Sequence, residues 1–203
     1  MNKIPVLIAT RNAHKAKEIA RILPAPYEVH TMAEYPDIPD PVENGTTFAA
    51  NAAIKAESVS ARVPGLVVAD DSGICVDLLN GAPGVMSARF CGEHGQDEEN
   101  NRKLLRELAA LPGQAPYRAH YACAISLAEN GHQIASFLGT VEGQITLNPA
   151  GTGGFGYDPL FIPDAFNNRT MAQLTPQEKD SISHRARALQ KLARFLVDNA
   201  VAK

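Results

Sequence analysis

The stretch from Tyr117 to Ile145 constrains the fold more than any other part of this 203-residue chain. It contains two long segments with the character of β-strands, and these segments meet at Asn130 and Gly131. Asn-Gly is the strongest short-range hairpin signal, because both central residues of the favoured two-residue turn need a positive φ. We therefore expect a sheet that contains a long hairpin.

Upstream of this stretch, predicted strands alternate with segments of helical periodicity. The apolar run 4–10 predicts a strand, and the apolar residues of 16–23 recur at helical spacing. Further strands are expected at 27–32, 65–70 and 74–79, the last after a turn at 71–73, and further helices at 46–63, 97–111 and from 175 onward. The last helix begins with the capping box Thr175-Pro176-Gln177-Glu178 and is expected to continue through Leu196. This order predicts the α/β (mixed α+β) class, with a long mixed sheet flanked by helices in a single domain, 1–203.

Composition excludes several classes of protein. The chain is 45% hydrophobic and 20% charged with a net charge of −3, which is ordinary for a globular protein and argues against duplex nucleic acid as the main partner. The apolar run 4–9 is too short for a signal peptide or a membrane span, so we expect no membrane partner and a cytoplasmic location. Small charged ligands remain possible.

A polar turn follows the first predicted strand. In "TRNAHK" the chain passes from a strand end into a helix, and the amides of a helix N-terminus favour anions. Lys15 and Arg11 would add positive charge there. The alternative is simple helix capping by Asn12, because the glycine-rich phosphate loop with its Gly-Lys-Ser/Thr ending is absent.

Two adjacent acids, Asp70 and Asp71, end the apolar run of "VVADDSG". Their charges repel one another unless a cation is present, and Mg²⁺ prefers a few carboxylates, waters and substrate phosphate oxygens. One acid can then take a proton from an attacking water. Glu43, before a predicted helix, is a candidate third ligand. The alternatives are a self-capping Asp-Asp-Ser-Gly turn and, for Glu43, an acid favoured by the helix dipole.

Two further stretches carry candidate binding residues. "SISHRARAL" places His184 and Arg185 on the last predicted helix, about 100° apart, so they point in different directions; a solvated basic face is the alternative. The glycines around Phe155 in "GTGGFGYDP" follow no phosphate-binding motif. They would let the backbone approach a flat ligand, with Phe155 stacking on it and Asp158 reading its edge. A glycine-rich turn with a buried phenylalanine is the alternative.

Five blocks, in this order, resemble the inosine/xanthosine triphosphate pyrophosphatase family: "ATRNAHKAKEI", "ENGTTFAANAAIKA", "ADDSGICVDLLNGAPGVMSARF", "GTGGFGYDPLF" and "LTPQEKDSISHRARAL". The resemblance runs from Leu7 to about Leu192. It implies an elongated two-lobed fold with a central nucleotide cleft, usually a homodimer that needs Mg²⁺. It also implies hydrolysis of ITP, dITP and XTP between the α and β phosphates, which removes deaminated purines from the nucleotide pool.

The same resemblance implies roles for single residues. Asp71 is similar to the family's general base and, with Glu43, to its metal ligands, while Asp70 and Lys15 complete the expected catalytic group. The expected substrate contacts are Thr10, Arg11, Asn12, Lys15, Ser72, Phe155, Gly156, Tyr157, Asp158, Lys179, His184 and Arg185. Arg11 stands where many members have glycine, and Val141 where relatives often have an aromatic residue.

Base selectivity would follow from polar pairing. Hypoxanthine and xanthine present an acceptor oxygen at C6 where adenine presents an amino donor, so donors from Lys179, His184 or Arg185 would distinguish them. A nucleotide-binding regulatory module without hydrolysis is the alternative function.

Overall fold

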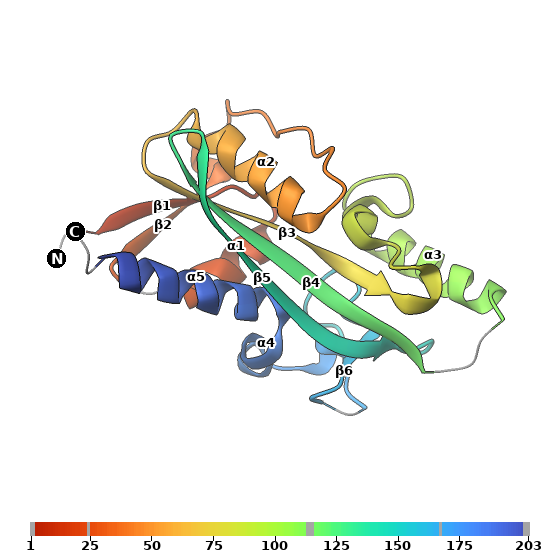
Figure 1. Ribbon diagram of the computed structural model, residues 1–203. Helices are drawn as coiled ribbons and strands as arrows, with labels where there is room; N and C mark the ends of the chain where they lie inside the picture. The colour runs from red at the N-terminus through yellow and green to blue at the C-terminus, as the bar shows by residue number, and fades with distance from the viewer. Residues whose placement is uncertain (1–2, 24, 113–115, 167, 201–203) are drawn as a thin grey trace. The chain divides into compact units, whose positions relative to one another are not determined.

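The computed structural model describes residues 3–23, 25–112, 116–166 and 168–200 (Figure 1). The outermost residues of the expected domain, 1–2 and 201–203, lie outside the described part. The helices are α1 (Ala13–Ile22), α2 (Phe48–Ser60), α3 (Asp97–Ala110), α4 (Pro176–Ile182) and α5 (His184–Ala200). The strands are β1 (Ile4–Ile8), β2 (Tyr27–Thr31), β3 (Leu66–Val76), β4 (Tyr117–Glu129), β5 (His132–Ile145) and β6 (Phe161–Pro163).

The strands form one mixed sheet in the order β2-β1-β3-β4-β5-β6, which confirms the predicted fold class. β1 pairs in parallel with β2 and with β3, whereas β5 pairs with β6 in antiparallel orientation. The hairpin is also confirmed. Asn130 (φ 53°) and Gly131 (φ 80°) connect β4 to β5, both with the positive φ that the turn requires.

Two details differ from the expectation. The run around Asp71 is not a turn between two strands, because β3 continues from Leu66 to Val76 and only residues 77–79 leave it as a 3₁₀ turn. Gly73 permits this continuity: a Cβ there would lie 2.2 Å from Ser87 Oγ, the atom that accepts from the amide of Ile74.

The last helix is likewise two helices. Ser183 adopts an extended conformation (ψ 152°) between α4 and α5. Serine is favoured at the residue that precedes a helix, so the chain ends one helix and starts another at this position.

The chain divides into two compact units. The first comprises Met1–Asp71, Cys123–Gly139 and His184–Lys203, and the second comprises Ser72–Ala122 and Thr140–Ser183. The expectation of one catalytic domain over the whole chain stays a prediction. Within the described residues, no helix has the length and apolar character needed to cross a membrane.

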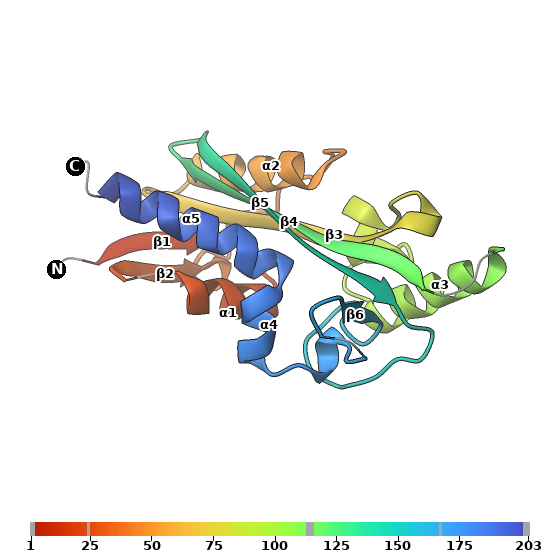
Figure 2. The ribbon, with the colours of Figure 1, turned by 60° about the horizontal axis from the view of Figure 1, so that its bottom comes forward.

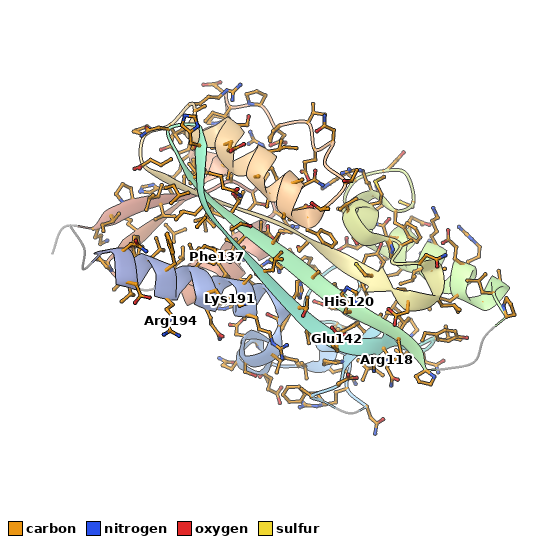
Figure 3. All side chains as sticks on the ribbon, viewed as in Figure 1. Arg118, His120, Phe137, Glu142, Lys191 and Arg194 are labelled. Carbon is orange, nitrogen blue, oxygen red and sulfur yellow. The ribbon has the colours of Figure 1, made fainter. Side chains whose placement is uncertain are left out.

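The first unit has three layers. Alternate residues of β1 face opposite sides of the sheet: Val6 and Ile8 pack with residues of α1 and α5, whereas Leu7 packs with residues of α2. Both ribbon views show α1 and α5 on one side of β1 and β3 and α2 on the other (Figures 1 and 2). Phe137 of β5 meets Phe195 of α5 at 5.5 Å between ring centres, and Lys191 of α5 donates to the carbonyl of Leu138 at 2.6 Å (Figure 3).

The second unit has its own apolar core. Residues of β3, β4 and β5 pack there against α3 and against the segment that contains β6. The fully or nearly buried members are Ile74, Val76, Leu104, Leu108, Tyr117, Ala119, Tyr121, Val141, Ile145, Tyr157, Leu160, Phe161, Met171 and Leu174. Val141 belongs to this core, with 2% of its surface exposed.

Strand order locates a site in the first unit. The chain leaves β1 through α1 toward β2 on one side, and then returns through α2 to β3 on the other side of β1. Ligands of open α/β sheets bind at such a switch point, beyond the carboxyl ends of the two strands. The turn after β1 lies at this place. The acidic pair lies within β3, just past Val68, which is the partner of Ile8 at the end of β1.

Candidate active site

Asp70 lies at the centre of a buried charge network in the first unit. Its Oδ2 accepts from Nη2 of Arg185 at 3.0 Å and from Nε at 3.2 Å, and its Oδ1 lies 3.2 Å from Nζ of Lys15. Arg185 also donates to the buried carboxylate of Glu18 on α1. Burial raises the pKa of Asp70, but Lys15, Arg185 and Lys55 outweigh it and hold this pKa far below its ordinary value. These cations therefore favour the charged form of Asp70.

Asp71 faces a different set of partners. Its Oδ1 accepts from Nζ of Lys55 at 3.0 Å, and its Oδ2 accepts from the side-chain amide of Asn51 at 3.2 Å. Burial and the nearby charge of Glu43 raise the pKa of Asp71, against the opposing effect of Lys55 and Lys15, and the net shift is upward. Adjacent carboxyl groups whose pKa values move apart are typical of an acid–base site.

Lys55 stands between the two expected metal ligands. Its Nζ lies 3.2 Å from Oε2 of Glu43 and 3.0 Å from Oδ1 of Asp71. Burial lowers the pKa of Lys55, but the negative charges of Asp71, Asp70 and Glu43 raise it by more than burial lowers it. The net shift of this pKa is therefore upward. The ammonium of Lys55 thus forms ion pairs with both carboxylates, so Glu43 and Asp71 can bind the same cationic group.

Sequence reasoning missed three members of this network, namely Asn51, Lys55 and Glu18. Asn51 and Lys55 are four residues apart on α2, so both project from one face of the helix toward Asp71. The available sequence signal was a single asparagine among the alanines of the predicted helix 46–63. Asn51 is fully buried, and its Oδ1 accepts from the amide of Gly45 at 2.8 Å.

The turn between β1 and α1 is built by short polar side chains. Asn12 caps α1, because its Oδ1 accepts from the amides of His14 (2.9 Å) and Lys15 (3.2 Å), as the capping alternative requires. Thr10 Oγ1 accepts in turn from the amide of Asn12 at 3.2 Å. Arg11 donates to Asp40 and to backbone carbonyls of the segment that follows β2.

His184 begins α5, close to β5. A Cβ on Gly139 would lie 2.2 Å from the carbonyl oxygen of His184 and 2.6 Å from the amide nitrogen of Ala188, so only glycine lets the strand approach the helix this closely. His184 is 5% exposed and Arg185 is 2% exposed. The basic pair is therefore buried, and the solvated basic face considered from the sequence is wrong.

The second unit brings together Phe155, Asp158 and Lys179. Oδ2 of Asp158 accepts from Nζ of Lys179 at 2.7 Å and from the amide of Phe155 at 3.0 Å. The ammonium of Lys179 lies 5.0 Å from the ring centre of Phe155, within the range of a cation–π contact. A Cβ on Gly154 would lie 1.9 Å from Oδ2 of Asp158, so this loop needs a glycine there.

The two residues between Phe155 and Asp158 have structural partners. The hydroxyl of Tyr157 donates to the carbonyl of Ser87 at 2.9 Å, and burial raises the pKa of this phenol. The amide of Gly156 donates to Asp97 at 2.7 Å, and its carbonyl accepts from Asn101 at 3.0 Å. Ser72 follows Asp71 directly in β3 and is half-buried.

A divalent metal can be tested against this geometry. Within the described residues, no group of three or more His, Cys, Asp or Glu side chains is arranged to hold an ion. Mg²⁺ commonly uses only one or two carboxylates and completes its shell with water and phosphate oxygens. Glu43 and Asp71, joined through Lys55, fit that smaller donor set.

Comparison with known proteins agrees with this chemistry. A dITP/XTP pyrophosphatase of Geobacillus kaustophilus is 47% identical over 189 residues, which cover 92% of this chain and 91% of the relative. The structure of the Staphylococcus aureus Ham1 protein is 39% identical with a TM-score of 0.83 and covers 96% of this chain and 99% of that one. A HAM1 protein from Coxiella burnetii is 36% identical with a TM-score of 0.85, over 96% and 99% of the two chains. The model of the Ham1 family matches residues 6–195, and the chain therefore belongs to the Ham1 family.

Proposed function

We propose that this protein is a pyrophosphatase that hydrolyses deaminated purine nucleoside triphosphates, namely dITP, ITP and XTP, to the monophosphate and pyrophosphate. The observation that carries the proposal is the acidic pair in the middle of β3. Asp70 is held as an anion by Lys15 and Arg185, whereas the pKa of its neighbour Asp71 is raised. The names of the curated relatives support the substrate class.

Asp71 is the proposed general base. A carboxylate with a raised pKa takes up a proton more readily, and Lys55 and Asn51 hold its two oxygens in place. Asp71 accepts the proton of a water that attacks the α-phosphorus; the bond from that phosphorus to the bridging oxygen breaks, and pyrophosphate leaves. Lys15 and the N-terminus of α1 bind the phosphate oxygens.

Magnesium is the proposed cofactor, with Glu43 and Asp71 as its protein ligands. When bound, it supplies charge neutralisation to the phosphate oxygens and orients them. Lys55 lies within hydrogen-bond distance of both ligands and sets the separation of their carboxylates.

Within the second unit, base recognition is assigned to Phe155 and Lys179. The ring of Phe155 offers a stacking surface, and the ammonium of Lys179 offers donors for a 6-oxo group. Asp158 orients that ammonium at 2.7 Å. Guanine also has a 6-oxo group, so rejection of GTP must depend on its 2-amino group.

We further propose a cytoplasmic homodimer.

Product analysis tests this function. The protein is incubated with dITP, ITP, XTP, GTP and ATP, with and without Mg²⁺, and monophosphate plus pyrophosphate is separated from diphosphate plus orthophosphate. We expect Mg²⁺-dependent pyrophosphate release from the deaminated nucleotides and little from ATP or GTP. Binding of ITP without hydrolysis would instead identify a regulatory nucleotide-binding module, and orthophosphate release would contradict both.

A further inference from the structure

The segment between β2 and α2 carries Glu43 with little backbone support. It contains Pro36, Pro39 and Pro41, which have no amide hydrogen to donate. Backbone bonds reach as far as Ile38, whose amide donates to the carbonyl of Tyr35 at 3.2 Å. In the described chain, residues 39–44 make no backbone–backbone hydrogen bond. The position of Glu43 therefore depends on side chains that hold this segment.

Arg11 is such a side chain. From the turn after β1, its Nε donates to Oδ1 of Asp40 at 2.9 Å, and its Nη2 donates to the carbonyl of Ile38 at 2.6 Å. A third, longer contact joins its Nη1 to the carbonyl of Met32 at 3.5 Å. One planar guanidinium thus contacts three points of the segment, which a lysine ammonium cannot reproduce.

The carbonyl contact contributes more than the ion pair. The side chain of Asp40 is 71% exposed, so its attraction to Arg11 is screened by water. The bond to Ile38 joins a charged donor to a backbone acceptor at a short distance, and such bonds are among the strong ones. The attachment therefore fixes the backbone itself rather than a mobile side chain.

The length of chain between Asp40 and Glu43 limits how far Glu43 can lie from the attachment. An extended chain covers about 3.3–3.6 Å per residue, so three residues past Asp40 limit Glu43 to a region about 10 Å in radius. Lys55 holds the carboxylate of Glu43 at 3.2 Å, and Asn51 holds the amide of Gly45 at 2.8 Å. The segment is thus secured on both sides of Glu43.

We propose that Arg11 is a positioning residue for Glu43: it attaches the proline-rich segment to the turn that carries Lys15 and thereby sets where Glu43 meets Asp71. The proposal rests on the proposed function at one point, the role of Glu43 as a metal ligand. It differs from the sequence-based expectation, in which Arg11 contacts phosphate directly.

Hydrogen exchange in the metal-free protein tests the attachment without any activity measurement. Arg11→Met should raise by about tenfold the exchange of the Tyr35 and Ile38 amides, which donate to the carbonyls of Met32 and Tyr35 next to the attachment, and Arg11→Lys should raise it nearly as much, because both lose the fork of donors. Arg118→Met is the matched control. Arg118, near the start of β4 in the second unit (Figure 3), is 44% exposed and donates to the two carboxylate oxygens of Asp164 at 2.8 Å, so its loss should leave the Tyr35 and Ile38 amides unchanged.

Steady-state kinetics with dITP give the second readout. Arg11→Met should raise the Mg²⁺ concentration for half-maximal rate by about tenfold, with a smaller change in the KM for nucleotide. Unchanged exchange together with a raised KM for dITP alone would overturn the proposal and identify Arg11 as a phosphate contact. If the wild-type protein releases no pyrophosphate, the proposed function fails, and the exchange comparison alone then decides whether Arg11 holds the segment.

Discussion

At the residue scale, the environment of Asp70 and Asp71 separates two chemically identical side chains. Both carboxyl groups are buried, and burial raises the pKa of each. Asp70 has Arg185 and Lys15 as close cationic partners, whereas Asp71 shares Lys55 with Glu43. The number of nearby cations per carboxylate decides which acid stays charged and which one becomes the stronger base.

Replacement of Asp71 tests the role of the base. Asp71→Asn removes the proton acceptor but keeps the shape of the side chain, so turnover with dITP should fall by about 10²- to 10⁴-fold with a modest change in nucleotide binding. Turnover is measured by pyrophosphate release, and binding by calorimetry with a non-hydrolysable analogue. Asp198→Asn, on the exposed part of α5, is the control. Near-normal turnover of Asp71→Asn would remove this residue from the base role.

At the element scale, short helices depend on their ends. α4 has only seven residues, and Thr175 accepts from the amide of Glu178 while Glu178 accepts from the amide of Thr175. Arg169 adds a bond of 2.7 Å to the carboxylate of Glu178. This arrangement places Lys179, in the next position of the same helix, beside Asp158.

The pKa of Glu178 reports on this cap. The bond from Arg169, followed by the amide of Thr175, lowers this pKa from its ordinary value of 4.5 to about 2. Because the folded-state pKa is depressed, the contribution to stability is fully present above 4.5 and is lost as the pH falls through about 2. In Arg169→Met, a carbon-detected NMR titration should show this pKa moving up toward 4.5. A Glu178 pKa that does not move would show that Arg169 is not the cause of its depression.

At the scale of the whole molecule, the boundaries of the two units fall inside strands. The chain passes from one unit to the other within β3 after Asp71, within β4 after Ala122 and within β5 after Gly139. Neither unit can unfold alone without interrupting three continuous strands. Cooperative behaviour of the full chain follows from this connectivity.

Thermal unfolding is expected to be a single transition, with calorimetric and van't Hoff enthalpies in a ratio of about 1. The chain contains no tryptophan, so one reporter can be introduced in each unit without background. Phe195→Trp reports on the first unit and Phe166→Trp on the second, and their fluorescence midpoints should coincide with the calorimetric one. Two separate midpoints would contradict this expectation and show that the units unfold independently.

The local features of the fold were accessible from the sequence because they depend on neighbours along the chain. The Asn130-Gly131 turn, the cap at Thr175 and the periodicity of the first helix each involve interactions over a few residues. The sequence did not reveal that β3 continues past Asp71, because that continuity depends on Ser87, which reaches Gly73 and Ile74 from fourteen and thirteen positions away. Nor did it reveal the break at Ser183.

The chemistry of the candidate site divides in the same way. The acidic pair, the turn after β1 and the resemblance to a nucleotide pyrophosphatase family are properties of short motifs, and the sequence by itself determined them. The partners of these residues come from distant segments: Lys55 and Asn51 from α2, Glu18 from α1 and Arg185 from α5. Only the tertiary structure decided which carboxylate keeps its charge and which holds its proton more readily, because pKa values depend on burial and on charges within a few ångströms, and neither is a property of local sequence.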